Sequence, residues 1–168
     1  LSYNIYLPTK KLGNFSLFGF GGLSDQNQNA KKDSTLWEED YQRYDYTYFS
    51  NTGVTGLKHT ITLNLNTFLQ TTLLFSFHYY GDQEDRFDNN YNPQFNYKSA
   101  YTTKRITLAS VINNKLNAKN NLRSGVYLKQ YAYNLTDRYL DKETNQIEEP
   151  LNSTSHARTL QAFSQWSY

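Results

Sequence analysis

Apolar and polar residues alternate along several stretches of the chain, and this repeat of two is typical of β-strands with one apolar face. Between Phe68 and Tyr80, one parity holds Leu69, Leu73, Phe75, Phe77 and Tyr79, and the other holds Gln70, Thr72, Ser76 and His78. Leu57, Ile61, Leu63 and Leu65 form a similar series, as do Ile106, Leu108, Ile112 and Leu116, and Leu122, Val126 and Leu128. The pattern predicts strands at about 15–20, 46–64, 68–80, 100–116, 122–138 and 156–168.

The predicted connections differ in length in a regular way. Tight turns are expected near Pro8, Asn66 and Lys119, whereas long polar loops are expected at about 25–45, 81–98 and 139–155. Short turns at one rim and long loops at the other are typical of an up-and-down transmembrane β-barrel. The predicted strands also exceed the roughly 9–11 residues that a tilted strand needs to cross a bilayer. We therefore expect an all-β, antiparallel transmembrane barrel with its long loops outside the cell.

Charged residues in the predicted strands follow the same alternation. The polar parity carries Lys58, Arg105, Lys115, Arg123 and Lys129. A cation on the lipid face costs about 2–4 kcal/mol at the bilayer midplane, whereas a wet lumen accepts it. Lys104 and Arg158 occupy the apolar parity, and we expect them beside the long loops, where that cost falls to about 0–1 kcal/mol.

Aromatic residues are abundant, with 16 Tyr and 10 Phe. They gather where the predicted strands meet the predicted long loops, at 44–49, 79–80, 97–101 and 131–139. Barrels carry aromatic girdles at both membrane interfaces, so we expect a girdle here. Two alternatives are a general abundance of Tyr without positional meaning and a surface on which carbohydrate stacks.

The overall composition excludes several classes of protein. No run of about 20 apolar residues is present, so helical membrane spans are excluded, whereas barrel strands dilute their apolar residues with polar ones. A net charge of +2 argues against a nucleic-acid binder. The absence of Cys excludes disulfides, thiolate metal sites and a Cys nucleophile.

Candidate sites for chemistry are weak. His59, His78 and His156 are too far apart in the sequence for a zinc site with close ligand spacing. The segment Asp82–Asn90 is rich in oxygen ligands for Ca²⁺ but lacks the EF-hand spacing and its central Gly. Gly19, Gly21 and Gly22 lie in a predicted strand, where Gly marks a bend or bulge rather than a phosphate site. With no Gly-x-Ser-x-Gly elbow either, we expect no catalytic, cofactor or metal site and no enzymatic activity.

Three segments are similar to a known family. Ser50–His59, Asn113–Gly125, and Pro8–Lys11 leading into Phe15–Gly19 resemble the barrel half of TonB-dependent receptors of the Bacteroidota type. The resemblance implies a 22-stranded barrel around a plug, in the outer membrane of a Gram-negative bacterium. Such a receptor imports a scarce nutrient (a small molecule, glycan or peptide) with energy from the TonB complex of the inner membrane.

In that family, residues 1–168 would be one segment of a single barrel domain, with about six to seven strands and with neither a recognisable plug nor a TonB box. Its other partners would be the bilayer and the lipopolysaccharide of the outer membrane, and no nucleic acid. Two alternatives have other functions: a soluble all-β binding or adhesion module, and an outer-membrane barrel that transports nothing.

Overall fold

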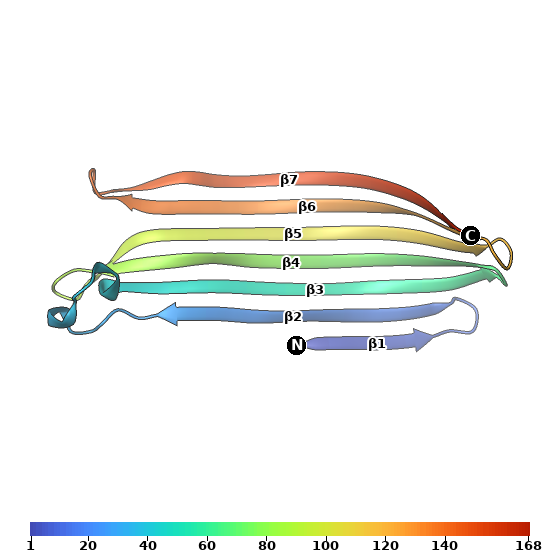
Figure 1. Ribbon diagram of the computed structural model, residues 1–168, viewed down its shortest axis with the longest axis horizontal. Coiled ribbons are helices and arrows are strands. Elements are labelled where there is room, and N and C mark those ends of the chain that lie inside the picture. Colours follow the sequence, from blue (N-terminus) through green and yellow to red (C-terminus); the bar gives the residue numbers. More distant parts are fainter.

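In the computed structural model, which describes residues 1–168, the chain forms one antiparallel sheet whose seven strands lie side by side in chain order (Figure 1). The strands are β1 (Ser2–Pro8), β2 (Asn14–Gln28), β3 (Tyr44–Asn64), β4 (Thr67–Phe87), β5 (Pro93–Lys115), β6 (Asn121–Asp141) and β7 (Gln146–Ser167). Two single-turn 3-10 helices, η1 (Ser34–Leu36) and η2 (Asp40–Arg43), lie between β2 and β3. The all-β, antiparallel, up-and-down arrangement expected from the alternation is confirmed.

The sheet is a single open layer. Strands β1 and β7 each have a neighbour on one side only, so the seven strands do not close into a barrel. Of 117 backbone hydrogen bonds, 106 lie within the regular elements, so the strand ladder supplies nearly all of the backbone pairing. Neither short helix has the length or the apolar character needed to cross a membrane.

The register between strands brings the apolar residues into line. One row of apolar side chains crosses all seven strands through directly opposed partners: Ile5, Leu17, Leu57, Leu73, Leu108, Leu128 and Leu160. Directly opposed residues place their side chains on the same face of a sheet. The predicted apolar and polar parities therefore become two faces, which we call the apolar face and the polar face.

The apolar face is uncovered. Leu73, Leu128 and Leu160 keep 51%, 48% and 72% of their surface exposed, and only nine of the 168 residues are buried. No second sheet or helix of this chain lies over these side chains (Figure 1). The apolar residues are thus not the interior of a sandwich formed within this chain.

The structure corrects the extent of two predicted loops. Most of 81–98 and 139–155 is strand, because β4 continues to Phe87, β5 begins at Pro93, and β6 and β7 are joined by a turn at 142–145. The sequence interpretation equated polarity with a loop, but a strand whose two faces are both wet can be polar throughout. Cross-strand contacts such as Asn96 Nδ2 donating to Glu84 Oε1 hold these polar extensions together.

The other predicted connections agree better with the structure. The tight turns near Pro8, Asn66 and Lys119 are confirmed, at 9–13, 65–66 and 116–120. The predicted loop at 25–45 is the one long connection, although it covers only 29–43. This loop and the turns at 88–92 and 142–145 lie together at one end of the sheet, opposite the three short turns (Figure 1).

The positions of Lys104 and Arg158 also differ from the expectation. Because the strands are longer than predicted, neither cation lies beside a loop: Lys104 is in the middle of β5, and Arg158 is in the middle of β7. Both remain on the apolar face, where Lys104 is opposite Ala132 and Arg158 is opposite Gln130. The explanation based on nearby loops is wrong for both residues.

Candidate functional surface

A row of opposed residues at the middle of the strands divides the sheet into two halves. The row consists of Gly21, Gly53, Phe77, Lys104, Ala132 and His156. We call the part between this row and the 29–43 loop the loop half. The row itself and everything toward the three short turns form the turn half.

Charge is segregated between the two halves. All fifteen acidic residues lie in the loop half: Asp25, Asp33, Glu38, Glu39, Asp40, Asp45, Asp82, Glu84, Asp85, Asp88, Asp137, Asp141, Glu143, Glu148 and Glu149. The turn half holds ten of the seventeen basic residues: Lys10, Lys11, Lys58, Lys104, Arg105, Lys115, Lys119, Arg123, Lys129 and Arg158. The near-neutral total charge therefore conceals an acidic end and a basic end.

The polar face of the loop half is lined with tyrosines. The register places eight of them on this face. Tyr44 and Tyr139 lie near strand ends, and we call the other six the tyrosine surface: Tyr46, Tyr48, Tyr80, Tyr97, Tyr101 and Tyr133. The rings of Tyr80 and Tyr101 have centroids 5.4 Å apart, and the ring of Tyr80 stacks on His78 at 4.6 Å. The ring of Tyr133 stacks on that of Tyr131, just across the middle row, at 5.9 Å and 3°.

Carboxylates orient two residues of the tyrosine surface, Tyr101 and Tyr46. The Tyr101 hydroxyl donates to Asp137 Oδ1 at 2.5 Å, and the Tyr46 hydroxyl lies 3.3 Å from Asp82 Oδ2. Asp82 Oδ1 also accepts a hydrogen bond from the hydroxyl of Ser99, which is only 3% exposed. Ring faces beside oriented hydroxyls and carboxylates can stack on a flat solute and exchange hydrogen bonds with its hydroxyl groups.

These tyrosines were expected in a girdle at the junctions of strands and loops, and the structure places several of them elsewhere. Tyr131 and Tyr133 lie in the middle of β6 and on the polar face. The cluster at 44–49 lies at the start of β3, and Tyr139 lies near the end of β6. Extending the two-residue alternation through the supposed loops would have found the shared face.

Further along the polar face, in the turn half, an open hollow of about 360 Å³ contains three cations. Its wall includes Arg105, Arg123 and Lys129 and no acidic residue. Lys129 Nζ donates to Gln161 Oε1 at 2.9 Å, whereas the buried Nε of Arg105 has no hydrogen-bond partner. We call this hollow the cationic groove. Its donors suit an anionic group, because no carboxylate of the chain competes for them.

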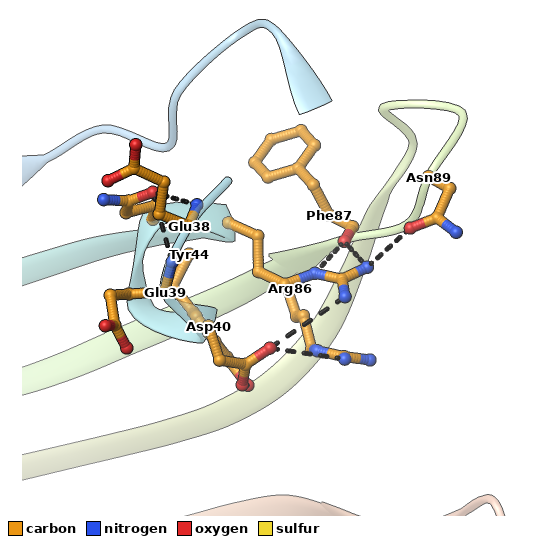
Figure 2. A network of polar contacts seen from close by, with 9 residues as sticks. Glu38, Glu39, Asp40, Tyr44, Arg86, Phe87 and Asn89 are labelled. Atoms are coloured by element: carbon orange, nitrogen blue, oxygen red, sulfur yellow. Dashed lines mark hydrogen bonds and ion pairs between the residues drawn. The ribbon is translucent and has the colours of Figure 1, made fainter. Parts of the chain in front are cut away.

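At the loop end, polar contacts join the 29–43 loop to the end of β4 and to Asn89 of the turn at 88–92 (Figure 2). Arg43 donates through Nε and Nη2 to the carbonyl oxygen of Phe87, at 2.9 and 2.7 Å. Asp40 accepts from the Tyr44 hydroxyl at 2.9 Å and lies 3.7 Å from Arg86. The contacts of Arg43 with Phe87 and of Asp40 with Arg86 bring together residues more than 40 positions apart in the sequence.

Aromatic side chains complete this arrangement, which we call the loop cap (residues 29–43 with the turn 88–92). Tyr91 stacks on Phe87 at 4.5 Å and faces Trp37 at 6.3 Å, and the Arg43 guanidinium lies 4.7 Å from the Trp37 ring. Tyr91 adopts a backbone φ of +64°, which non-glycine residues seldom do. Phe87 and Ala30 are among the few buried apolar residues. The loop cap is therefore a packed structure.

Two aspartates order the backbone of the loop cap. Asp33 accepts hydrogen bonds from the hydroxyl and the amide of Thr35, which lower the pKa of its carboxyl. Asp88 accepts from the amides of Asn92 and Asn90 at 2.8 and 2.9 Å, and the bond from the Asn92 amide is the main cause of the lowered pKa of Asp88. Both carboxylates act as local turn formers.

The candidate metal ligands do not come together. His59 stacks on Phe15 in the turn half, His78 stacks on Tyr80, and His156 lies opposite Ala132. Asp82–Phe87 belongs to β4, where successive side chains point to opposite faces, so this segment is not a calcium loop. No group of three or more His, Asp or Glu side chains is placed to hold a metal ion.

The fold defines the chain as an all-β protein with one long antiparallel sheet, an apolar face and a polar face. No protein-family model, curated protein or solved structure matches the sequence. The functional argument therefore depends on the geometry of the two faces.

Proposed function

We propose that this chain is part of a transmembrane β-barrel in an outer membrane, with its apolar face against lipid and its polar face toward a wet lumen. The observation that carries the proposal is the row of exposed apolar residues across all seven strands of an uncovered sheet. A contiguous apolar surface of this size marks a contact with a membrane or with another protein. The cations of the polar face fit a lumen, where they stay hydrated.

The height of the apolar surface supports the bilayer as its partner. On β5 and just beyond it, apolar-face side chains run from Ile106 to Leu116, a distance of about 33 Å at about 3.3 Å per residue. A strand tilt of about 40° reduces this to about 25 Å, the height of the apolar band of outer-membrane barrels. Trp166 lies at the end of the apolar surface nearest the short turns. It is 69% exposed, and its indole Nε1 donates to Asn120 Oδ1 at 2.8 Å. An amphipathic ring there suits the headgroup region.

The strands are longer than the bilayer requires, so only one half of the sheet would lie within it. Strands β3 to β7 have 21 to 23 residues, about twice the number that crosses a membrane. In the proposed orientation the turn half spans the bilayer, and the loop half extends outside the cell with its acidic residues and its loop cap. The unpaired edges of β1 and β7 would pair with further strands to close the barrel.

Within this class we propose an importer of the TonB-dependent type, on the resemblance of Ser50–His59 and Asn113–Gly125 to that family. The nutrient would meet the tyrosine surface first and then pass the cationic groove, because both lie on the polar face. Aromatic rings that can stack, beside carboxylates bonded to tyrosine hydroxyls, suit a small molecule, glycan or peptide with many hydrogen-bonding groups. Energy would come from the TonB complex through other parts of the protein.

The membrane proposal can be tested by spin labelling, because the chain contains no Cys. Single substitutions Leu73→Cys and Leu128→Cys are matched with Thr72→Cys and Lys129→Cys on the neighbouring positions of the opposite face. In the full-length protein, without other cysteines and in native outer membranes, labels at 73 and 128 should collide with oxygen, which dissolves in lipid. Labels at 72 and 129 should collide with a water-soluble nickel chelate.

A soluble module would give a different result. Its labels would show no preference for oxygen at 73 and 128, and the full-length protein would remain monodisperse in buffer without detergent. The import step is tested separately, by the architecture of the complete protein and by its energy dependence. A plug and a TonB box whose deletion abolishes nutrient uptake would support import; a plugless barrel of 8–14 strands would refute it and leave the membrane proposal intact.

A further inference from the structure

Lys104 and Arg158 are exposed cations on the face that carries the leucine row, and the polar residues Gln130 and His156 lie beside them on that face. Neither takes part in any of the three ion pairs of the chain, all of which lie in the loop half. No acidic residue exists in the turn half to neutralise them. In the proposed membrane orientation, both therefore need an anionic partner from outside the chain.

The two cations flank β6 and can reach a common point. Lys104 lies opposite Ala132 on β6, and Arg158 lies opposite Gln130, two residues further along the same face. Their Cα atoms are about 10 Å apart across the strands and about 7 Å along them. Ala132 is small, and both side chains are long and flexible, so an ammonium and a guanidinium can meet over β6.

Their depth coincides with a change in the apolar face. On the side toward the short turns, the next residues of this face are apolar: Ile106, Leu108, Leu128 and Leu160. On the side toward the loop cap they are polar on β5, β6 and β7, namely Thr102, Asn134 and Thr154. The same row holds Tyr79 on β4 and Leu23 on β2. The cations therefore lie at the upper edge of the apolar surface, where the head groups of the outer leaflet would be.

A hollow at this edge is lined by both apolar and cationic side chains. It has a volume of about 370 Å³, and its wall includes Leu108, Leu128 and Leu160 together with Gln130, Lys129 and Arg158. Lys104 lies outside this wall, on the far side of β6 from Arg158. Acyl chains fit the leucine side of this hollow, and a phosphate fits the guanidinium, which can donate two hydrogen bonds to it.

We propose that Lys104 and Arg158 bind the phosphate of an anionic lipid of the outer leaflet, whose acyl chains lie along the leucines below. The inference rests on the proposed membrane location and adds a specific lipid site to it. It also accounts for the two cations that depart from the alternation of the strands. The lipid class is a phosphorylated lipid, of which a phosphorylated lipid A is a representative.

The test measures lipid retention by the full-length protein. The protein is reconstituted with equal amounts of a diphosphorylated lipid A and its dephosphorylated form, re-extracted in mild detergent, and analysed by native mass spectrometry. The wild type should retain the phosphorylated form preferentially. The double variant Lys104→Gln/Arg158→Gln should lose this preference by about tenfold or more, because two charge-assisted contacts are removed.

The matched control removes two cations of the polar face that line neither this hollow nor the cationic groove. Lys58→Gln/Lys115→Gln should keep the wild-type preference, and gel mobility without heating verifies that every variant is folded. Equal retention of the two lipids by the wild type, or an unchanged preference in Lys104→Gln/Arg158→Gln, would overturn the lipid site while the labels at 73 and 128 still report a membrane protein. A wild type that is soluble without detergent would overturn both proposals.

Discussion

The two halves of the sheet share one backbone conformation but differ in almost every other respect. The turn half has ten basic residues, no acidic residue, and leucine, isoleucine and valine on one face. The loop half has all fifteen acidic residues, the tyrosine surface, the loop cap and all three ion pairs. The strands pass from one half to the other with the ladder unbroken at the middle row.

In the proposed membrane orientation, this difference separates the length of the strands from the height of the bilayer. Backbone hydrogen bonds between strands form in lipid and in water alike, so the ladder does not indicate where the bilayer would end. The side chains do indicate it, because hydrocarbon excludes carboxylates whereas water accepts charges of both signs. The change on the apolar face at Lys104 and Arg158 is therefore the proposed outer boundary of the bilayer.

The largest expected effect comes from placing one charge on the same face in each half. Leu128→Arg puts a cation among the leucines of the turn half, and Asn134→Arg puts it six residues further along β6 in the loop half. We expect Leu128→Arg to lower the free energy of unfolding by about 2–4 kcal/mol and Asn134→Arg by about 0–1 kcal/mol. Urea unfolding of the full-length protein in lipid vesicles measures both, and equal losses would contradict the division into halves.

A smaller effect tests how tightly the loop half is paired. At Gly81 on β4, an added Cβ would overlap the backbone oxygen of Ser99 and lie 3.0 Å from the Cα of Ala100, whereas at Gly22 on β2 it would meet nothing within 4 Å. Gly81→Val should therefore cost about 1–3 kcal/mol through overpacking. Gly22→Val should change stability by less than about 0.5 kcal/mol. If Gly81→Val proves harmless in the same urea measurement, the extension of β4 beyond the middle row is loosely paired.

The sequence predicts the turn half better than the loop half, because the two halves differ in the polarity of their faces. In the turn half one face is apolar and the other polar, so the strands and their two faces follow from alternation, whereas the row through Leu57 and Leu108 comes from the register between strands. In the loop half both faces carry polar side chains, so the alternation weakens and 81–98 resembles a loop. The contact of Arg43 with Phe87 joins residues 44 positions apart, and no local pattern contains it.

A more local effect concerns the attachment of the loop cap. Arg43→Lys keeps the charge but loses the paired donation to the Phe87 carbonyl, since an ammonium cannot reproduce the guanidinium fork. Amides of 29–43, including the Lys31 amide that donates to the Gln42 carbonyl, should exchange about tenfold faster. The free energy of global unfolding should stay unchanged.

The control Arg138→Lys alters the exposed ion pair with Glu149 and should leave the exchange of these amides as in the wild type. Unchanged exchange in Arg43→Lys would mean that the aromatic contacts alone hold the loop cap.

The smallest expected effect is a pH dependence confined to the turn at 88–92. The hydrogen bonds from the Asn92 and Asn90 amides to Asp88 lower the pKa of that carboxyl below its ordinary value of 3.8. A carboxyl with a lowered pKa stabilises the turn fully above its ordinary pKa, and this contribution is lost as the pH falls through the lowered value. Amide exchange of this turn, corrected for the intrinsic rate, should therefore be constant at pH 5 and higher and should accelerate below about 3.8.

Asp88→Asn keeps an acceptor oxygen but cannot titrate, so its exchange should not change over this range. Glu143→Gln in the 142–145 turn should behave like the wild type. An acceleration that persists in Asp88→Asn would show that another group titrates in the loop half.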